Sequence, residues 1–397
     1  MRALVIAPQP FFSPRGTPLS VYYRTLVTSQ LGVRVDLLTY GAGEDVDIPG
    51  VRIIRIPRFR FLEPIEVGPS MAKLFLDGFV VLWTVGLLVR HRYDFVHAHE
   101  ESVFFSRMLK PLFGFKLVYD MHSSLPQQLV NFRFTSSRAL IRLFKRLEDS
   151  CLRRSDAVIT ICPDLAAYAL PRLPDPRRHF LIENSIIEEV RLRNGDGRPA
   201  TTSAAGPADP APEPLPPDRP LVVYAGTFEP YQGIDLLLEA FARARERVPA
   251  AFLLLAGGRP DQVERYQRRA RELGLEGHCR FAGQVPQALA REYVRRAAVV
   301  VSPRTGGTNT PLKVYEQLAS GIPLVATRVH SHTQVLDDSV CFLADPVPEA
   351  FARGIVAALT DPARAARLAA AARELYHRRY SRPAYEGKMR ELLEALR

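Results

Sequence analysis

The sequence predicts an α/β protein made of two doubly wound, Rossmann-like domains, each built on a parallel sheet. Its 397 residues are enough for two domains that each bury a full core. In both halves, short apolar runs of strand length alternate with longer segments of helical length, as in parallel sheets with crossover helices. Residues 191–220 consist mostly of Gly, Pro, Ala, Ser, Thr and Asp, which indicates a flexible linker. We therefore place the N-terminal domain at 1–190 and the C-terminal domain at 221–380.

Composition and charge narrow the classes of partner. Hydrophobic residues make up 47% of the chain and charged residues 24%, as in ordinary soluble globular proteins. The formal net charge is +11, which indicates a negatively charged partner: nucleic acid, anionic lipid and phosphorylated substrates all fit. The four cysteines show no metal-binding spacing, and the apolar run at the N-terminus is too short for a signal peptide. We therefore expect free thiols and a cytoplasmic location.

The first strand, Ala3 to Ala7, is followed by a loop that ends in Arg15, Gly16 and Thr17. A helix is predicted over about 18–31, with Thr17 as its N-cap and a proline in its first turn. The N-terminus of this helix would face the mouth of a parallel sheet, where α/β proteins bind ligands. An ordinary structural loop is the alternative for this stretch.

Three histidines follow two strands of the N-terminal half. His97 and His99 end one strand and share a face because they are two residues apart. His122 follows the next strand, and the carboxyl ends of neighbouring parallel strands converge on one crevice. A His-x-His pair can bind zinc, but no third ligand can be named, and a hydrogen-bonded strand-end histidine is the alternative, above all for His97. Asp45-Val-Asp47 has the Asp-x-Asp form of some metal-dependent transferases, yet it lies in a polar turn, and we expect no metal at either place.

Two segments of the N-terminal half bear on membrane contact. The apolar stretch 74–89 contains Asp77 and Gly78 and falls short of the roughly 18 clean residues that a spanning helix needs, so we expect a buried or interfacial helix. Residues 138–154 form a basic amphipathic helix. Such a helix most commonly packs on a core with a solvated back, but peripheral membrane proteins also place one against anionic lipid.

The most informative pattern lies in the C-terminal half, between Ser302 and Thr327. An apolar run over 297–301 ends in a Thr-Gly-Gly-Thr loop at 305–308, and a helix is then predicted with Thr310 as N-cap and Pro311 as its first residue. A glycine loop that leads to a helix N-terminus suits a phosphate, because it presents unpaired N–H groups and the positive end of the helix dipole.

Two charged side chains accompany this predicted phosphate site. Lys313, in the first turn of the helix, adds a full positive charge. Glu316 lies one turn further on the same face and is suited to accept hydrogen bonds from sugar hydroxyls. The alternative is an ordinary strand–loop–helix unit with a solvated lysine–glutamate pair.

At this stretch the chain resembles the retaining nucleotide-sugar glycosyltransferases of family 4, which have the GT-B fold. Their donor-site signature is Glu-x7-Glu running into Ala-x-Gly-x-Pro-Val-Val-Ala. Glu316 matches the second acid and residues 318–326 match the rest. Thr308 occupies the position of the first acid, the residue that in the family contacts the transferred sugar. Asp94-Phe-Val-His-Ala-His99 resembles the family's Asp-hydrophobic-hydrophobic-His-x-His, and Gly16 matches its glycine loop.

The resemblance spans nearly the whole chain and implies two domains that face each other across a cleft, with a terminal helix at about 381–397 that returns to the first domain. It implies retaining transfer of a sugar from a nucleotide sugar to a glycan, lipid-linked or small-molecule acceptor, without metal or other cofactor. A role in cell-envelope polysaccharide and peripheral attachment to the inner face of the membrane would suit this class. Nucleic acid explains the charge but no motif, so it is not expected.

The resemblance also implies roles for particular residues. The expected catalytic residues are His99, Lys313 and Arg304. The expected donor-binding residues are Gly16, Gly226, Thr227, Gln284, Val285, Thr308, Asn309, Thr310, Pro311, Leu312, Lys313 and Glu316. The residues expected on the acceptor side are Arg15, Gly16, His99 and His122.

One departure from the family concerns the donor's pyrophosphate. Members usually clamp it with Arg and Lys at the places where this chain has Thr227 and Gln232. Arg304 and Lys313 are the candidates to replace these cations. Two alternatives stay open: a nucleotide-sugar epimerase on the same fold, active without an acceptor, and a non-catalytic nucleotide-sugar-binding protein, which the neutral clamp positions and Thr308 favour.

Overall fold

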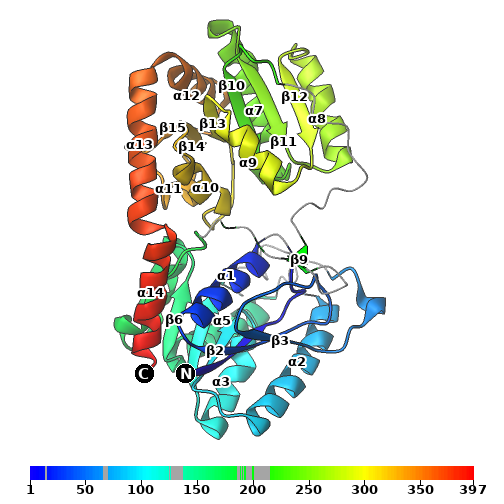
Figure 1. Cartoon of the computed structure of the whole chain (residues 1–397), viewed down its shortest axis with the longest axis vertical. Helices are drawn as coiled ribbons and strands as arrows, with labels where there is room; N and C mark the ends of the chain where they lie inside the picture. The colour runs from blue at the N-terminus through cyan, green and yellow to red at the C-terminus, as the bar shows by residue number, and fades with distance from the viewer. Residues whose placement is uncertain are drawn as a thin grey trace. The chain divides into compact units, whose positions relative to one another are not determined.

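The computed structural model describes residues 1–13, 16–65, 70–124, 126, 137–185, 188, 190, 192–193, 199–200 and 215–397. The chain folds as two compact units (Figure 1). The N-terminal unit comprises Met1–Thr202 together with Arg382–Arg397, and the C-terminal unit comprises Ser203–Ser381. The predicted linker over 191–220 falls largely outside the described residues. Within it, β8 (Leu192–Arg193) and β9 (Pro199–Ala200) form a short antiparallel pair.

The N-terminal unit contains a seven-stranded parallel sheet in the order β3-β2-β1-β4-β5-β6-β7. Its strands are β1 (Arg2–Ala7), β2 (Arg34–Thr39), β3 (Val51–Arg55), β4 (Phe95–His99), β5 (Lys116–Met121), β6 (Ala157–Thr160) and β7 (His179–Leu181). The direction of strand succession reverses between β1 and β4. Doubly wound sheets bind their ligands at the carboxyl ends of the strands beside such a switch point.

Helices cover both faces of this sheet. They are α1 (Thr17–Gln30), α2 (Met71–Arg90), α3 (Ser102–Phe113), α5 (Arg138–Arg154), α6 (Pro163–Ala169) and α14 (Arg382–Ala395), with the 3-10 turns η1 (Arg60–Leu62), η2 (Leu170–Arg172) and η3 (Pro176–Arg178). Alternate strand residues serve opposite faces: Ala3 and Val5 join the core with α1 and α14, while Leu4 and Ile6 join the core with α2, α3, α5 and α6. The predicted double winding is confirmed.

The C-terminal unit contains a six-stranded parallel sheet in the order β12-β11-β10-β13-β14-β15. Its strands are β10 (Leu221–Ala225), β11 (Phe252–Ala256), β12 (Cys279–Gly283), β13 (Val299–Ser302), β14 (Leu324–Thr327) and β15 (Phe342–Ala344). Its helices are α7 (Ile234–Arg247), α8 (Pro260–Glu272), α9 (Gln287–Arg295), α10 (Leu312–Ser320), α11 (His330–Thr333), α12 (Pro348–Thr360) and α13 (Pro362–Arg379), with the turn η4 (Pro230–Gln232). α7, α8 and α12 share one core with the sheet, and α10 packs against α13.

Two helices begin one residue away from the predicted points. α1 begins at Thr17, so Gly16, with a φ of 55°, holds the cap position in place of Thr17. α10 begins at Leu312 and is preceded by Pro311 in an extended conformation, so Thr310 is not its N-cap. Neither helix is capped by the side chain of its N-cap residue, because Gly16 has no side chain and that of Pro311 has no polar atom.

α2 differs from its prediction. It runs for 20 residues and continues through Lys73 and Asp77. Its length and its apolar composition are those of a helix that could cross a membrane. Length and composition alone do not assign a span, since core helices of soluble proteins share them. Only 28% of the apolar window is buried, with Leu76, Val80 and Leu87 on the sheet, so most of α2 lies at the surface.

The last helix, α14, packs into the core of the N-terminal unit. Met389 is fully buried there among residues of α1 and the sheet.

Met389→Ala should lower the free energy of unfolding of this unit by about 2–5 kcal/mol, because it empties a buried methionine site. Calorimetric melting of the full chain measures the change. Glu391→Ala, at an exposed position of the same helix, is the control, and equal melting of the two variants would show that α14 does not support this core.

Candidate active site

The carboxyl ends of β4 and β5 bring three of the predicted residues together. His97 and His99 share a face of β4, and their rings stack with centroids 4.7 Å apart. His99 stands opposite Asp120 of β5 in the parallel register, and His122 follows that strand. Nδ1 of His99 lies 2.9 Å from Nε2 of His122. All three imidazoles are buried.

Asp120 is the anion that holds this histidine cluster, and Arg24 of α1 supplies the counter-charge. Oδ2 of Asp120 lies 2.9 Å from Nε of Arg24 and 2.9 Å from Nε2 of His97. Oδ1 lies 3.4 Å from Nη2 of Arg24 and 3.4 Å from Nε2 of His122. The guanidinium of Arg24 also stacks over the ring of Tyr385 in α14, 5.5 Å from its centroid.

The protonation states follow from burial and this ion pair. Burial alone would raise the pKa of Asp120, but Arg24 and the imidazoles outweigh it and hold the pKa well below its usual range. Burial lowers the pKa of His99 well below its usual value and that of His122 to about 4, although Asp120 opposes both shifts. At neutral pH the cluster therefore combines an ionised carboxylate with neutral His99 and His122.

Arg24 and Asp120 were missed in the sequence. One hint was a charged residue inside the apolar helical stretch 21–27. The other was an acidic residue two positions before His122, just as His97 stands two positions before His99. Neither hint names the partner, because 96 residues separate Arg24 from Asp120 and only the folded register of α1 and β5 joins them.

Atoms of His97, His99 and Asp120 also lie within 4.8 Å of one another, close enough to share an ion. Arg24 already neutralises the same carboxylate at hydrogen-bond distance, so the charge of Asp120 is balanced without a metal. The prediction that no metal is needed stays a prediction.

Gly16 stands at the start of α1, at the carboxyl end of β1. Its φ of 55° is in the left-handed region, and a Cβ added there would meet no described atom within 4 Å. The backbone conformation therefore favours glycine, while the space beside it is open. Arg15, the neighbouring residue predicted on the acceptor side, lies outside the described residues.

In the C-terminal unit, the loops after β10 and β13 are joined at the carboxyl edge of the sheet. The N–H of Thr305 donates to the carbonyl of Tyr231 at 2.9 Å. A Cβ on Gly233 would lie 2.0 Å from the carbonyl oxygen of Pro303, so only glycine allows this approach. The two loops thus hold Gln232, Arg304 and the start of α10 in one place.

Lys313 points into this place. Its Nζ lies 2.8 Å from Oε1 of Gln232 and 4.4 Å from the centroid of the Tyr224 ring. A Cβ on Gly226 would lie 3.4 Å from the same Nζ. Lys313 therefore reaches Gln232, one of the two clamp positions, and Gly226, which precedes the other. Burial, and then Arg304, lower the pKa of Lys313 to about 7.

Arg304 is the second cation of the group. Its guanidinium lies over the ring of Tyr231, 5.0 Å from the centroid, and burial lowers its pKa. In the described part of the chain, neither Arg304 nor Lys313 has a carboxylate partner. Two half-buried cations without a carboxylate partner in the described residues, beside the start of a nine-residue helix, are an arrangement that suits an anion.

Glu316 is separate from Lys313. It accepts a hydrogen bond from Gln287 and lies near Arg291, both of α9, and burial raises its pKa despite them. The solvated lysine–glutamate pair that the sequence left open is therefore absent among the described contacts, since Lys313 is bound to Gln232 instead.

The remaining donor-side residues line the same edge with varied exposure. Thr227 and Gln284 are exposed and Val285 is half-buried after β12. Thr308 is exposed, and its carbonyl accepts from Gln334 at 2.6 Å. Asn309, Pro311 and Leu312 are half-buried, while Thr310 is buried and its hydroxyl has no hydrogen-bond partner in the described residues.

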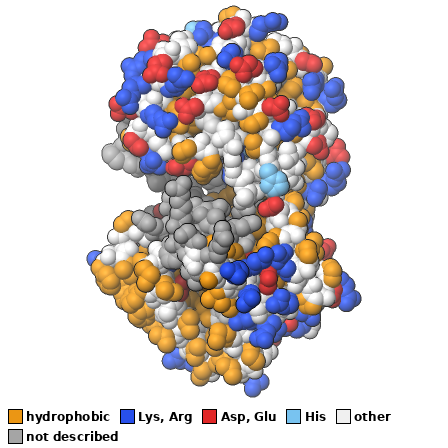
Figure 2. All heavy atoms as spheres, turned by 180° about the vertical axis from the view of Figure 1, so that it is seen from behind, with side chains coloured by type: hydrophobic (Ala, Val, Ile, Leu, Met, Phe, Trp, Pro, Cys, Tyr) orange, Lys and Arg blue, Asp and Glu red, His pale blue; other side chains and the backbone are white. Residues whose placement is uncertain are grey.

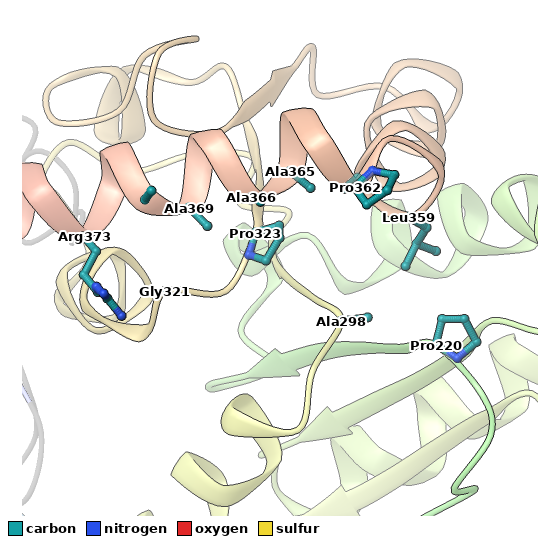
Figure 3. A pocket seen from close by; sticks show the side chains of 12 residues that line it. Pro220, Ala298, Gly321, Pro323, Leu359, Pro362, Ala365, Ala366, Ala369 and Arg373 are labelled. Carbon is teal, nitrogen blue, oxygen red and sulfur yellow. The ribbon is translucent and has the colours of Figure 1, made fainter.

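A cavity of about 710 Å³ lies elsewhere in this unit. Figure 3 shows Ala365, Ala366 and Ala369 of α13 above Pro323, with Arg373 and Gly321 at one end. Pro220, Ala298 and Pro323 precede β10, β13 and β14, so the cavity is at the amino ends of the strands. Its lining is mostly alanine and proline, and the anion site at the carboxyl ends is therefore the better candidate.

Two family models match the chain. The model "Glycosyl transferase 4-like domain" matches residues 23–185, and "Glycosyl transferases group 1" matches residues 207–375. A phosphatidyl-myo-inositol mannosyltransferase of Mycobacterium tuberculosis is 25% identical over 374 residues, which cover 91% of this chain and 88% of the relative. A D-inositol 3-phosphate glycosyltransferase of Xylanimonas cellulosilytica is 35% identical over 161 residues, a match that spans only 38% of that relative and 40% of this chain.

Solved structures share the fold over the full length. A sucrose-phosphate synthase of Thermosynechococcus elongatus has a TM-score of 0.73 at 23% identity and covers 100% of this chain and 98% of its own. HepE of Anabaena, solved in complex with UDP, has a TM-score of 0.71 at 16% identity and covers 100% of both chains. The similarity shows the same fold, with two parallel-sheet domains.

The unpaired charge of Lys313 predicts a gain of stability on its removal. Its pKa of about 7 lies below its ordinary value of 10.5, so between these pH values the unfolded chain binds more protons and stability falls as the pH falls. Lys313→Met should therefore raise the free energy of unfolding at pH 7, by about 2–4 kcal/mol, and by less at pH 10. Calorimetry at both pH values measures this. Lys145→Met at an exposed site is the control, and an equal or negative change for Lys313→Met would rule out the unpaired state.

Proposed function

We propose that this chain, which belongs to the glycosyltransferases with a 4-like domain and a group 1 domain, transfers a sugar from a nucleotide sugar with retention of anomeric configuration. The acceptor is a glycan, a lipid-linked molecule or a small molecule. The observation that carries the proposal is the unpaired Lys313 and Arg304 at the N-terminus of α10, because two adjacent cations without a carboxylate match the charge of a diphosphate.

The relatives support a nucleotide-bound donor. HepE was solved with UDP, and the mycobacterial relative is named as a mannosyltransferase that acts on phosphatidyl-myo-inositol. By likeness, we assign the nucleoside diphosphate to the C-terminal unit of this chain. The relatives named above are not named as epimerases or as non-catalytic binding proteins, so neither alternative is favoured.

The proposed reaction requires this chain to stabilise the negative charge of the departing nucleoside diphosphate. The bond between the anomeric carbon and the diphosphate breaks while a bond from that carbon to an acceptor oxygen forms. Negative charge grows on the departing phosphate, which takes up the proton of the acceptor hydroxyl. In this proposal Lys313, Arg304 and the N–H groups of α10 (Leu312–Ser320) stabilise that charge. In this proposal no metal ion is required for neutralisation.

Other residues take binding roles. Glu316 accepts hydrogen bonds from the donor ribose, and Gln284 and Val285 lie beside the base. Thr308 offers a hydroxyl to the transferred sugar in place of the family's carboxylate. His99 contacts a sugar hydroxyl, His122 lies on the acceptor side, and Gly16 leaves room for close approach of the backbone.

The replacement clamp predicts a specific loss and rescue. Lys313→Met should lower turnover about 10²–10³-fold, the effect of removing one donor to a developing anion, and should lower nucleotide affinity less. Release of nucleoside diphosphate from UDP-glucose and from GDP-mannose measures turnover. Adding Thr227→Arg and Gln232→Lys to this variant should restore part of the rate, because Gln232 already lies 2.8 Å from the lost ammonium.

Lys145→Met serves again as the control for that experiment. Parent-rate turnover by Lys313→Met would show that the clamp is elsewhere. A parent without turnover on any donor, but with nucleotide binding, would favour the binding protein.

We also propose that the N-terminal unit attaches peripherally to an anionic membrane on the cytoplasmic side. Exposed apolar side chains gather on η1, α2 and α3; this apolar surface consists of Phe61, Met71, Leu74, Leu82, Val89, Met108 and Leu112. Figure 2 shows hydrophobic side chains gathered on the N-terminal unit, and α3 packs against α5, which exposes Lys145, Arg146 and Arg153. Apolar insertion next to basic charge is the combination that binds anionic lipid.

Vesicle binding tests this surface. The full chain should sediment with vesicles containing anionic lipid, and salt should weaken the binding because exposed charges are screened within about 10 Å at 0.1 M. Leu74→Ser with Leu112→Ser should reduce binding several-fold, since these side chains are 65% and 76% exposed. Val347→Ser, at an exposed apolar position of the C-terminal unit, is the control. Equal binding by both variants would remove the apolar surface from the contact.

A further inference from the structure

We propose that Asp120 and His122 are positioning residues that fix the tautomer of His99, so that His99 presents Nε2–H to the substrate as a hydrogen-bond donor. The inference rests on the proposed function, because His99 is the histidine proposed to contact a sugar hydroxyl. It assigns to His99 the role of a hydrogen-bond donor, and it gives Asp120 and His122 functions that act through His99.

The contact between His99 and His122 allows only one hydrogen. Nδ1 of His99 and Nε2 of His122 are 2.9 Å apart, so one nitrogen donates and the other accepts. Both rings are neutral at pH 7, because burial lowers the pKa of each. The hydrogen therefore lies either on His122, which places the hydrogen of His99 on its Nε2, or on His99 itself, which leaves its Nε2 bare.

Asp120 decides between the two arrangements. Its Oδ2 already accepts from Nε of Arg24 and from His97, each at 2.9 Å, and lies 3.6 Å from His99. Its Oδ1 has one longer contact, with Nη2 of Arg24 at 3.4 Å, and faces Nε2 of His122 at 3.4 Å. The spare acceptor capacity is on the oxygen that faces His122, so the ionised carboxylate favours a hydrogen on Nε2 of His122.

The consequence appears at the other nitrogen of His99. Nε2 of His99 is buried and has no hydrogen-bond partner among the described residues. A buried polar atom of this kind costs stability unless something else satisfies it, which marks it as a position for a ligand. With its hydrogen on Nε2, neutral His99 binds an acceptor oxygen of the substrate, such as a sugar hydroxyl, and transfers no proton.

The tautomers can be observed directly. The full chain is labelled with ¹⁵N-histidine, and ring ¹⁵N shifts at pH 7 distinguish protonated from bare nitrogens; His99→Gln and His122→Gln assign the signals. We expect hydrogens on Nε2 of His99 and Nε2 of His122. A hydrogen on Nδ1 of His99 would overturn the proposal, and this measurement needs no substrate.

Asp120→Asn tests the origin of the preference. Removal of the charge should give His99 a mixture of tautomers, whereas unchanged shifts in a folded variant would show that Asp120 does not set them. Because this variant leaves Arg24 buried without an anion, its folding is not assured, and the parent spectrum and the His122 variants carry the test independently.

Kinetics separate positioning from a structural role. Glutamine can donate from its Nε2 in place of the imidazole, whereas methionine cannot. His122→Met should therefore lower kcat about 10–100-fold at unchanged KM for the donor, and His122→Gln should lower it several-fold less. UDP-glucose and GDP-mannose are the probes. His179→Gln is the matched control, since His179 is bonded to Thr160 in the same unit.

Equal rates for His122→Gln and His122→Met, with equal melting temperatures, would overturn the positioning role. If the parent turns over neither probe, the proposed function fails on these donors, and the ¹⁵N spectrum still decides the tautomer.

Discussion

The ion pair between Arg24 and Asp120 is the interaction on which the N-terminal unit depends. It joins α1 to β5, orients the imidazoles of β4, and sits under the ring of Tyr385, so the last helix covers the same buried charge. Breaking a buried pair by removing one partner typically costs about 3–5 kcal/mol, because the remaining charge has no solvent. The carboxylate that orders the histidines is thus also a condition for the fold around them.

The C-terminal unit solves the opposite problem. There the charges of Lys313 and Arg304 are held close without a carboxylate partner in the described residues, and burial, and then Arg304, lower the pKa of Lys313. Gly233 and the hydrogen bond from Thr305 to Tyr231, which joins the loops after β10 and β13, keep this arrangement in place. One unit therefore balances its buried charge internally, whereas the cations of the other have no carboxylate partner in the described residues.

Much of the fold could be predicted, because alternating apolar strands and helices with glycine-bearing exits specify parallel sheets. The glycine loop before α10 and the convergence of strand ends follow from the same local patterns. Helix starts were placed one residue away at Gly16 and Pro311, since capping depends on backbone angles that the residue types only bias.

Long-range pairings were beyond the sequence for a different reason. The partners Arg24 and Asp120, or Lys313 and Gln232, are 96 and 81 residues apart, and nothing local marks one for the other. The surface position of α2 was equally hidden, because its apolar composition is compatible with a core, an interface or a membrane.

The order of segments along the chain has a consequence for biosynthesis. The C-terminal unit, residues 203–381, interrupts the N-terminal unit, whose core is completed by α14 at the end of the chain. On the ribosome, the interrupting unit is complete at Ser381, while the unit translated first still exposes the apolar surface that α14 will cover. The half of the protein that is made first is therefore the last to finish folding.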